Sequence, residues 1–263
     1  MRRPSGRLAA AATACAVAIL GAASIPTEGT AEAEGPRDRA GAGGSGDRAS
    51  AAAGLTVLAT GDSMMQIVDV NLARRLEPGG RVDVRSDTRI STGISKPNLL
   101  NWPRYAAAQA RRLRPRATVV FLGANDGFNM RSRSGRRVRC CSRRWSREYA
   151  RRARRMMVSY AQRGAARVYW LLLPQARSGF FRRAYPAVNR GLRRAARGLP
   201  TVRVIALNKV FTPRGRYRRY LRYRGRRVRA RQGDGIHLSP AGASIAASIV
   251  VRQMRADRVF AAP

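Results

Sequence analysis

The most constraining feature of this sequence is a fivefold alternation of short apolar runs with longer amphipathic segments. The apolar runs cover residues 55–60, 82–85, 117–122, 168–173 and 202–207. The amphipathic segments carry apolar residues at helical spacing and cover residues 64–76, 104–113, 146–163, 181–197 and 240–254. Short, continuous apolar strands are typical of a parallel sheet whose two faces are both covered. The pattern therefore predicts an α/β fold, a three-layer α/β/α sandwich around a five-stranded parallel sheet.

The first 33 residues have the pattern of an export signal. Three arginines precede an uncharged run over residues 8–23, and an Ala-Glu-Ala site for cleavage lies at residues 31–33. The run is shorter than the roughly 20 residues that a membrane span needs, and an uncleaved signal anchor is the alternative. Residues 34–54 are rich in Gly, Ala and Ser without periodicity, which predicts a flexible linker. We expect one exported domain over residues 55–263, either secreted or associated with the cell envelope.

The chain is strongly basic, with a formal net charge of +39. Such a field attracts polyanions, whether nucleic acid, anionic wall polymers or anionic lipid headgroups. Because we expect the protein to be exported, wall polymers and headgroups are the expected partners, and nucleic acid is disfavoured. Arginine is densest in residues 131–155 and 212–231, which we interpret as basic loops that hold an anionic partner. An alternative of equal weight is that both segments are solvated surface and hold no partner.

Cysteine and histidine are too scarce to build a metal centre. Three Cys and one His cannot supply a Cys₄ or a His-rich site, and we expect no metal or cofactor. Cys140 and Cys141 are adjacent, and neighbours in sequence rarely pair because the bridge strains the backbone. We therefore expect no disulfide framework, and an intermolecular bridge or free thiols are the alternatives.

Polar residues with catalytic potential follow the predicted strands. Residues 61–63 (Gly-Asp-Ser) come after the first strand, and residues 123–126 (Gly-Ala-Asn-Asp) come after the third. Residues 91–93 (Ser-Thr-Gly) lie in the loop after the second strand, and residues 234–237 (Asp-Gly-Ile-His) precede the last helix. Because the carboxyl ends of parallel strands share one edge of a sheet, the site of such a fold lies there.

These residue types supply what acyl transfer requires. Ser63 can be the nucleophile, the sole histidine, His237, can take its proton, and Asp234 can orient the imidazole. The backbone amides of Ser63 and Gly93 and the side-chain amide of Asn125 can form an oxyanion hole. We also expect the N-terminus of the helix after Ser63 to add positive potential.

Each motif by itself has a plain structural alternative. Gly-Asp-Ser and Gly-x-Asn-Asp are common turns, and Asp-x-x-His can be a capping pair at a helix start. The order of the motifs and the place of the single histidine favour the catalytic interpretation. For Asp62 and Asp126 we prefer the structural interpretation, in which each carboxylate accepts hydrogen bonds from nearby loop amides.

The four motifs together resemble the sequence blocks of the SGNH (GDSL-type) hydrolases, and residues 91–103 further resemble an exported bacterial branch. The resemblance spans residues 55–250 and implies a flavodoxin-like sandwich with five parallel strands. It implies esterase, lipase or carbohydrate O-deacetylase chemistry through a Ser-His-Asp triad without a metal. The residues that it assigns are Ser63, Gly93, Asn125 and His237, with Asp234 as third member of the triad.

The sequence thus predicts an exported serine esterase that removes O-acyl groups, O-acetyl above all, from an envelope glycan. One alternative is a basic wall-polymer binding protein with a vestigial or slow hydrolase site. A second is an acyltransferase, because transfer to another alcohol uses the same triad. A nucleic-acid-binding protein has only the net charge of +39 in its favour.

Overall fold

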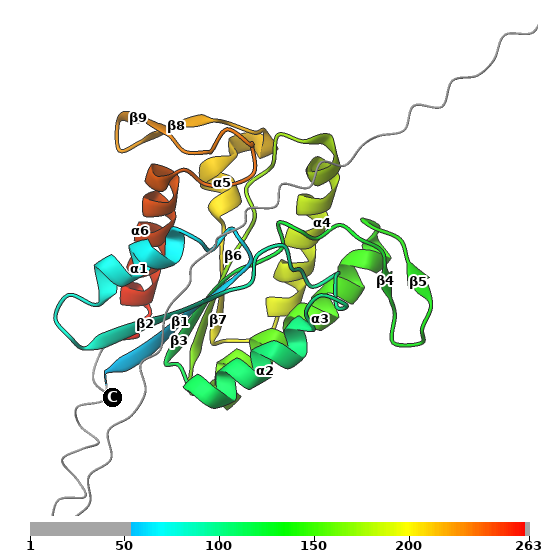
Figure 1. Ribbon diagram of the computed structural model, residues 1–263, viewed down its shortest axis with the longest axis horizontal. Coiled ribbons are helices and arrows are strands. Elements are labelled where there is room, and N and C mark those ends of the chain that lie inside the picture. The colour runs from blue at the N-terminus through cyan, green and yellow to red at the C-terminus, as the bar shows by residue number, and fades with distance from the viewer. Residues whose placement is uncertain (1–53, 261–263) are drawn as a thin grey trace, which may run out of the picture. The chain divides into compact units, whose positions relative to one another are not determined.

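The computed structural model describes residues 54–260, and its centre is a five-stranded sheet between two layers of helices (Figure 1). The strands are β1 (Leu55–Gly61), β2 (Val82–Thr88), β3 (Ala117–Phe121), β6 (Arg167–Leu171) and β7 (Val202–Ile205). They lie in the order β2-β1-β3-β6-β7, and all neighbours are parallel. The predicted three-layer α/β/α sandwich is confirmed. The predicted signal peptide (1–33) and linker (34–54) lie outside the described residues, apart from Gly54.

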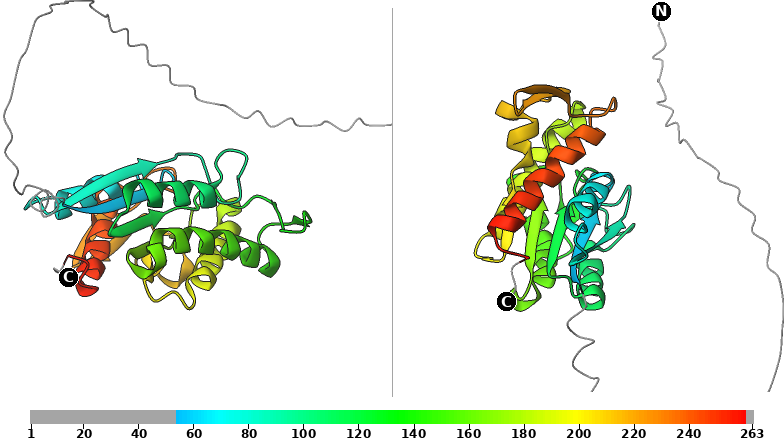
Figure 2. Two further views of the ribbon diagram at one scale, coloured as in Figure 1. Left: turned by 90° about the horizontal axis from the view of Figure 1, so that it is seen from below. Right: turned by 90° about the vertical axis from the view of Figure 1, so that its left-hand side faces the viewer.

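Five longer helices cover the two faces of the sheet. They are α1 (Val68–Leu76), α2 (Trp102–Leu113), α3 (Arg143–Ala161), α4 (Gly179–Ala196) and α6 (Pro240–Ala256). The first and last pack together on one face, and α3 contacts both α2 and α4 on the other (Figures 1 and 2). Shorter pieces are α5 (Leu207–Phe211) and the 3₁₀ turns η1 (Gln162–Gly164) and η2 (Pro213–Gly215). Within residues 54–260, no helix combines the length and the hydropathy that a membrane span requires.

The apolar runs of the sequence form the core. All five residues of β3, the central strand, are buried, and so are the last four of β6. Side chains of a strand point alternately to the two faces, so complete burial requires cover on both. The helices supply this cover, which explains why the runs are continuous rather than alternating.

The helix after β1 begins later than its apolar spacing predicts. It starts at Val68 rather than at residue 64, because the amide of Met64 donates to the carboxylate of Asp62 and Ile67 has a φ of 69°. Residues 62–67 therefore form a turn, and Ser63 lies in this turn rather than at the helix N-terminus. Because the effect of a helix dipole falls off within one turn, the helix adds less positive potential at Ser63 than expected.

The two basic segments contain hairpins that their sequences do not reveal. Residues 131–155 include most of a small hairpin, β4 (Met130–Arg131) with β5 (Arg137–Val138), and then the start of α3. Residues 212–231 contain a second hairpin, β8 (Tyr220–Tyr223) with β9 (Arg226–Arg229). Between its strands, Arg224 and Gly225 have φ angles of 49° and 78°, as a tight two-residue hairpin turn requires. The interpretation of these segments as loops is corrected accordingly.

Cys140 and Cys141 form a disulfide, contrary to the expectation that adjacent cysteines do not pair. The peptide bond between them is cis, and their Cα atoms are 3.3 Å apart, closer than the roughly 3.8 Å across a trans bond. Since the bridge joins neighbours in sequence, it cross-links no two elements of the fold.

Candidate active site

The strand order reverses at β1 and β3, and Asp62 joins the loops that follow these two strands. One oxygen of its carboxylate accepts hydrogen bonds from the amides of Gly123 and Ala124, both at 2.8 Å. The other oxygen accepts from the amide of Met64 at 3.0 Å. In sheets of this kind, ligands bind where the strand order reverses. The structural interpretation of Asp62 is confirmed, because its carboxylate holds the two halves of the candidate site together.

Asp62 is completely buried, and this changes its titration. Burial raises the pKa of its carboxyl, the three backbone hydrogen bonds lower it, and the neighbouring Asp126 raises it again, to about 6 in all. The residue before it must be glycine. Gly61 has a φ of 155°, and a Cβ there would collide with the carbonyl group of Phe121 on β3.

Asp126 plays the same structural part for the loop that carries Gly93. Its carboxylate accepts hydrogen bonds from the amide and hydroxyl of Ser95, both at 2.7 Å, and from the amide of Ile94 at 3.2 Å. The hydroxyl of Tyr149 on α3 donates to it at 2.7 Å. Burial raises the pKa of Asp126, although these hydrogen bonds oppose the rise. The structural interpretation of this residue is confirmed as well.

Ser63, His237 and Asp234 form a continuous hydrogen-bonded chain. The ring nitrogen Nε2 of His237 lies 2.8 Å from Oγ of Ser63. The other ring nitrogen, Nδ1, lies 2.5 Å from Oδ2 of Asp234. A nucleophile next to an imidazole that a carboxylate orients is the arrangement that serine-dependent acyl transfer uses.

The carboxylate of Asp234 is placed to stay ionised. Burial raises its pKa, but the hydrogen bonds from the His237 ring and from the amides of Ile236 and His237 outweigh burial, so the pKa lies below its ordinary value. The backbone donors reach Oδ1 at 2.8 and 3.1 Å, which leaves Oδ2 for the imidazole. A carboxylate held in this way fixes the ring and favours its protonated form during a reaction.

The three donors of the expected oxyanion hole come from the segments that follow β1, β2 and β3, and two of them, Ser63 and Asn125, belong to residues that line one pocket. Within residues 54–260, neither the amide of Ser63 nor that of Gly93 donates to another group. The side-chain amide of Asn125 donates to the carbonyl of Thr92 at 3.1 Å, which ties the loop after β3 to the loop before Gly93. Gly93 is also sterically required, because a Cβ there would lie 2.6 Å from Oδ1 of Asp126.

Arg231 supports the loop of His237, a role that we do not predict from the sequence. Its side chain is completely buried, although no carboxylate within residues 54–260 pairs with it. It donates to the carbonyls of Gln175, Gly235 and Ile236 at 3.0, 3.3 and 2.7 Å. In the sequence it is one of ten arginines in residues 212–231, and nothing in their spacing marks it out.

An open pocket of about 660 Å³ adjoins the serine hydroxyl. Its walls combine apolar and polar side chains from the loops after β1, β2, β3 and β9. The lining residues are Ser63, Met64, Gln66, Ile67, Ile90, Ser91, Asn125, Gln232, His237 and Leu238. The pocket has room for an acyl group together with part of its alcohol, and it opens to solvent.

Metal ligands do not gather in this part of the chain. Among residues 54–260, no three side chains of His, Cys, Asp or Glu lie close enough together to hold a metal ion.

Comparison with known sequences identifies one family. The model of the family described as "Protein of unknown function (DUF459)" matches residues 56–253, which is most of the chain and nearly all of the described part. No curated protein sequence matches this chain.

Several solved structures have a similar fold at low identity. The catalytic domain of the peptidoglycan O-acetyltransferase OatA from Streptococcus pneumoniae is 12% identical, with a TM-score of 0.48 over 78% of this chain and 95% of that one. The esterase EstA from Pseudoalteromonas sp. is 11% identical, with a TM-score of 0.47 over 76% and 96%. The lipase Lip_vut3 from a goat rumen metagenome is 15% identical, with a TM-score of 0.43 over 75% and 96%.

Proposed function

Since this chain belongs to the DUF459 family and has the fold and motif order of SGNH/GDSL-type hydrolases, we propose that it is a serine esterase. The single observation that carries the proposal is the hydrogen-bonded chain from Ser63 through His237 to Asp234. Two of its members, Asp234 and His237, lie three positions apart in the sequence, but the serine lies 174 residues from the histidine. The fold brings all three into contact, and Ser63 and His237 line one pocket.

The proposed reaction follows from this geometry. Oγ of Ser63 attacks the carbonyl carbon of an ester while Nε2 of His237 takes the hydroxyl proton. The negative charge that develops on the carbonyl oxygen is stabilised by the amides of Ser63 and Gly93 and by the free N–H of the Asn125 side chain. Breaking the ester bond releases the alcohol, which receives the proton from His237. Water then attacks the acyl-serine with the same histidine as base, and the acid leaves.

The walls of the pocket favour a short acyl group. Met64, Ile67, Ile90 and Leu238 offer apolar contact close to the serine, while polar side chains line the rest. A long acyl chain would need a continuous apolar channel, and the lining of this pocket is mixed. We expect acetyl and other short esters to be preferred.

We further propose that the natural substrate carries O-acyl groups, O-acetyl above all, on an envelope glycan. The support is the export signal predicted over residues 1–33 together with the net charge of +39, which favours anionic material outside the cell. The same triad would serve an acyltransferase, in which a glycan hydroxyl replaces water in the second step. Product analysis distinguishes the two, because only transfer yields a newly acylated glycan.

The rival function is binding without catalysis. A basic domain that holds an anionic wall polymer would need only its charge, and its hydrolase site would be vestigial or slow. The complete set of catalytic side chains favours the esterase, since a site without a function is under no pressure to keep all of its members.

Hydrolysis of p-nitrophenyl acetate, butyrate and octanoate by the purified chain tests the proposal. We expect the acetate to be cleaved fastest, and Ser63→Ala to lower the rate by about 10³-fold or more. Ser134→Ala, at the exposed tip between β4 and β5, is the matched control and should keep the full rate. Full activity of Ser63→Ala on every ester would reject the esterase.

A further inference from the structure

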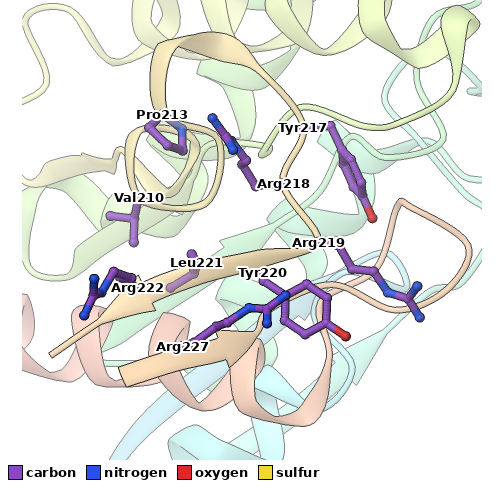
Figure 3. A pocket seen from close by; sticks show the side chains of 9 residues that line it. All are labelled: Val210, Pro213, Tyr217, Arg218, Arg219, Tyr220, Leu221, Arg222 and Arg227. Atoms are coloured by element: carbon purple, nitrogen blue, oxygen red, sulfur yellow. The ribbon is translucent and has the colours of Figure 1, made fainter. Parts of the chain in front are cut away.

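A second pocket, separate from the candidate active site, lies between the β8–β9 hairpin and the segment that follows β7 (Figure 3). Its volume is about 700 Å³, and it is open to solvent. Arginine and tyrosine dominate its walls. The lining residues are Val210, Pro213, Tyr217, Arg218, Arg219, Tyr220, Leu221, Arg222 and Arg227. The proposed reaction uses none of them.

The four arginines of this pocket have no acidic partner. All four are exposed, and none forms an ion pair with a carboxylate within residues 54–260. The sequence explains why, because it contains no Asp or Glu between Glu148 and Asp234. A pocket with four like charges and no counter-charge is a favourable place for an anionic group.

A tyrosine ring holds two of these guanidinium groups. The guanidinium carbon of Arg227 lies 4.4 Å from the ring centroid of Tyr220, and that of Arg219 lies 6.0 Å from it. Tyr220 as a whole is 41% exposed. Figure 3 shows the side chains of Tyr220, Arg227 and Arg219 along the same edge of the pocket. An aromatic face beside guanidinium forks suits a sugar ring that carries a carboxylate or phosphate.

The pocket is linked to the candidate active site through Arg231. The ring of Tyr217, which lines the pocket, lies 5.2 Å from the guanidinium carbon of Arg231. Arg231 in turn donates to the carbonyls of Gly235 and Ile236, next to His237. Arg231 thus contacts both a side chain of the pocket wall and the loop that carries His237.

We propose that this hairpin pocket binds an anionic polysaccharide, with guanidinium groups on its charged oxygens and Tyr220 against a sugar ring. The choice of a polysaccharide as the ligand rests on the proposed esterase function. Polysaccharides carry O-acyl groups that an esterase can remove, whereas nucleic acids and the headgroups of a bilayer surface offer none of this kind. The hairpin would hold the polymer while successive acyl groups reach Ser63.

Binding is measured on the full chain with Ser63→Ala, so that no ester is consumed. The probes are dextran phosphate, polygalacturonate and unmodified dextran of the same length. The test variant removes three charges from the pocket through Arg218→Gln, Arg222→Gln and Arg227→Gln. The matched control removes three charges from exposed positions on α2, α3 and α4 through Arg111→Gln, Arg155→Gln and Arg194→Gln.

We expect the two anionic polymers to bind and unmodified dextran not to bind. The test variant should weaken binding at least tenfold and reduce the slope of log K against log salt by about two to three. The control variant should change the affinity less than threefold. Tyr220→Ala should weaken the binding of dextran phosphate but not that of inorganic polyphosphate, which has no sugar ring. If only one of the two anionic polymers binds, the result would still support the hairpin pocket and would show whether it prefers phosphate or carboxylate groups.

Three results would overturn the inference. Equal losses in the test and control variants would mean that total charge, not this pocket, holds the polymer. Equal or tighter binding of an oligothymidylate would identify a nucleic acid as the ligand. The same result with phosphatidylglycerol vesicles would identify a membrane. Polymer binding by a chain whose esterase assay fails would reject the proposed function alone, and ester hydrolysis without polymer binding would reject this inference alone.

Discussion

Nε2 of His237 lies 2.8 Å from Oγ of Ser63, although the two residues are 174 positions apart in the sequence. The serine follows the first strand of the sheet, and the histidine precedes the last helix, α6. Their contact depends on the loops that hold each of them in place.

Removal of the Asp234 charge should abolish most of the activity without unfolding the protein. In Asp234→Asn, the side-chain oxygen can still accept from the amides of Ile236 and His237. The amide that replaces Oδ2 cannot accept from Nδ1 of His237, so the ring no longer presents a basic Nε2 to the serine. We expect kcat for p-nitrophenyl acetate to fall by about 10⁴-fold, with little change in KM. Kinetics at 25 °C beside a thermal melt measure both effects, and unchanged kcat would remove Asp234 from the triad.

Asp62 should make the stability of the fold depend on pH. Its pKa is about 6 in the folded protein, against an ordinary value of 3.8. Between these values the folded state binds more protons than the unfolded state, so the free energy of unfolding should fall as the pH rises from about 4 to about 6. A pKa shift of this size corresponds to a change of about 3 kcal/mol in the free energy of unfolding.

Urea unfolding at several pH values measures this slope. Asp62→Asn should reduce the slope of the free energy of unfolding against pH by an amount that corresponds to at most one bound proton. Asp126 should account for part of the remaining slope, since burial raises its pKa as well. Asp83→Asn removes a half-exposed carboxylate of β2 that pairs with Arg85 and is the control, which should change the slope less than Asp62→Asn does. A wild-type stability that does not change between pH 4 and 6 would contradict the raised pKa.

Gly93→Ala should damage both stability and activity. The new methyl group would lie 2.6 Å from Oδ1 of Asp126, the oxygen that accepts from Ser95, so the loop or the carboxylate must move. We expect a loss of about 1–3 kcal/mol in stability and a lower kcat from a displaced oxyanion donor. Gly179→Ala, at the start of α4, meets only a flexible arginine end at 3.9 Å and serves as the control. Equal behaviour of the two variants in melting and kinetics would show that Gly93 is not constrained.

Arg231→Met should lower kcat more than it affects KM. The change keeps much of the side-chain volume but removes the three hydrogen bonds that hold the carbonyls of Gln175, Gly235 and Ile236. A displacement of the His237 loop by about 1 Å can cost about 10²-fold in rate. We expect partial recovery with Arg231→Lys, which keeps a donor, and full activity with Arg229→Met on the exposed face of β9. Assays well below the melting temperature separate this effect from simple unfolding.

Much of the fold could be predicted from the sequence because its signals are local. Apolar runs of four to six residues alternate with helical spacing, and a sheet covered on both faces explains them without knowledge of any partner. The motif residues after these strands could be identified for the same reason, since parallel strands bring their carboxyl ends to one edge. The structure places Ser63, Asn125, Asp234 and His237 at that edge.

The hairpins and the Cys140–Cys141 bridge could not be predicted, because their signals are weak or misleading. In residues 212–231, arginine occupies so many positions that the alternation of buried and exposed side chains is hidden. The turn at Arg224 and Gly225 uses arginine where asparagine or aspartate would mark a hairpin. The two adjacent cysteines pair although neighbours in sequence rarely do, and no pattern in the sequence indicates the bridge.

The amino-acid pattern is enough to infer the order of the strands along the chain, the burial of the apolar runs and the residue types available for catalysis. The groups that hold the catalytic residues in place become visible only in the folded protein. Asp62 and Asp126 accept hydrogen bonds from loops 31 to 62 positions away, and Arg231 is buried without a carboxylate partner among the described residues. The physical reason is that such contacts depend on distances in space between loops, whereas hydrophobic periodicity depends only on the neighbours of a residue along the chain.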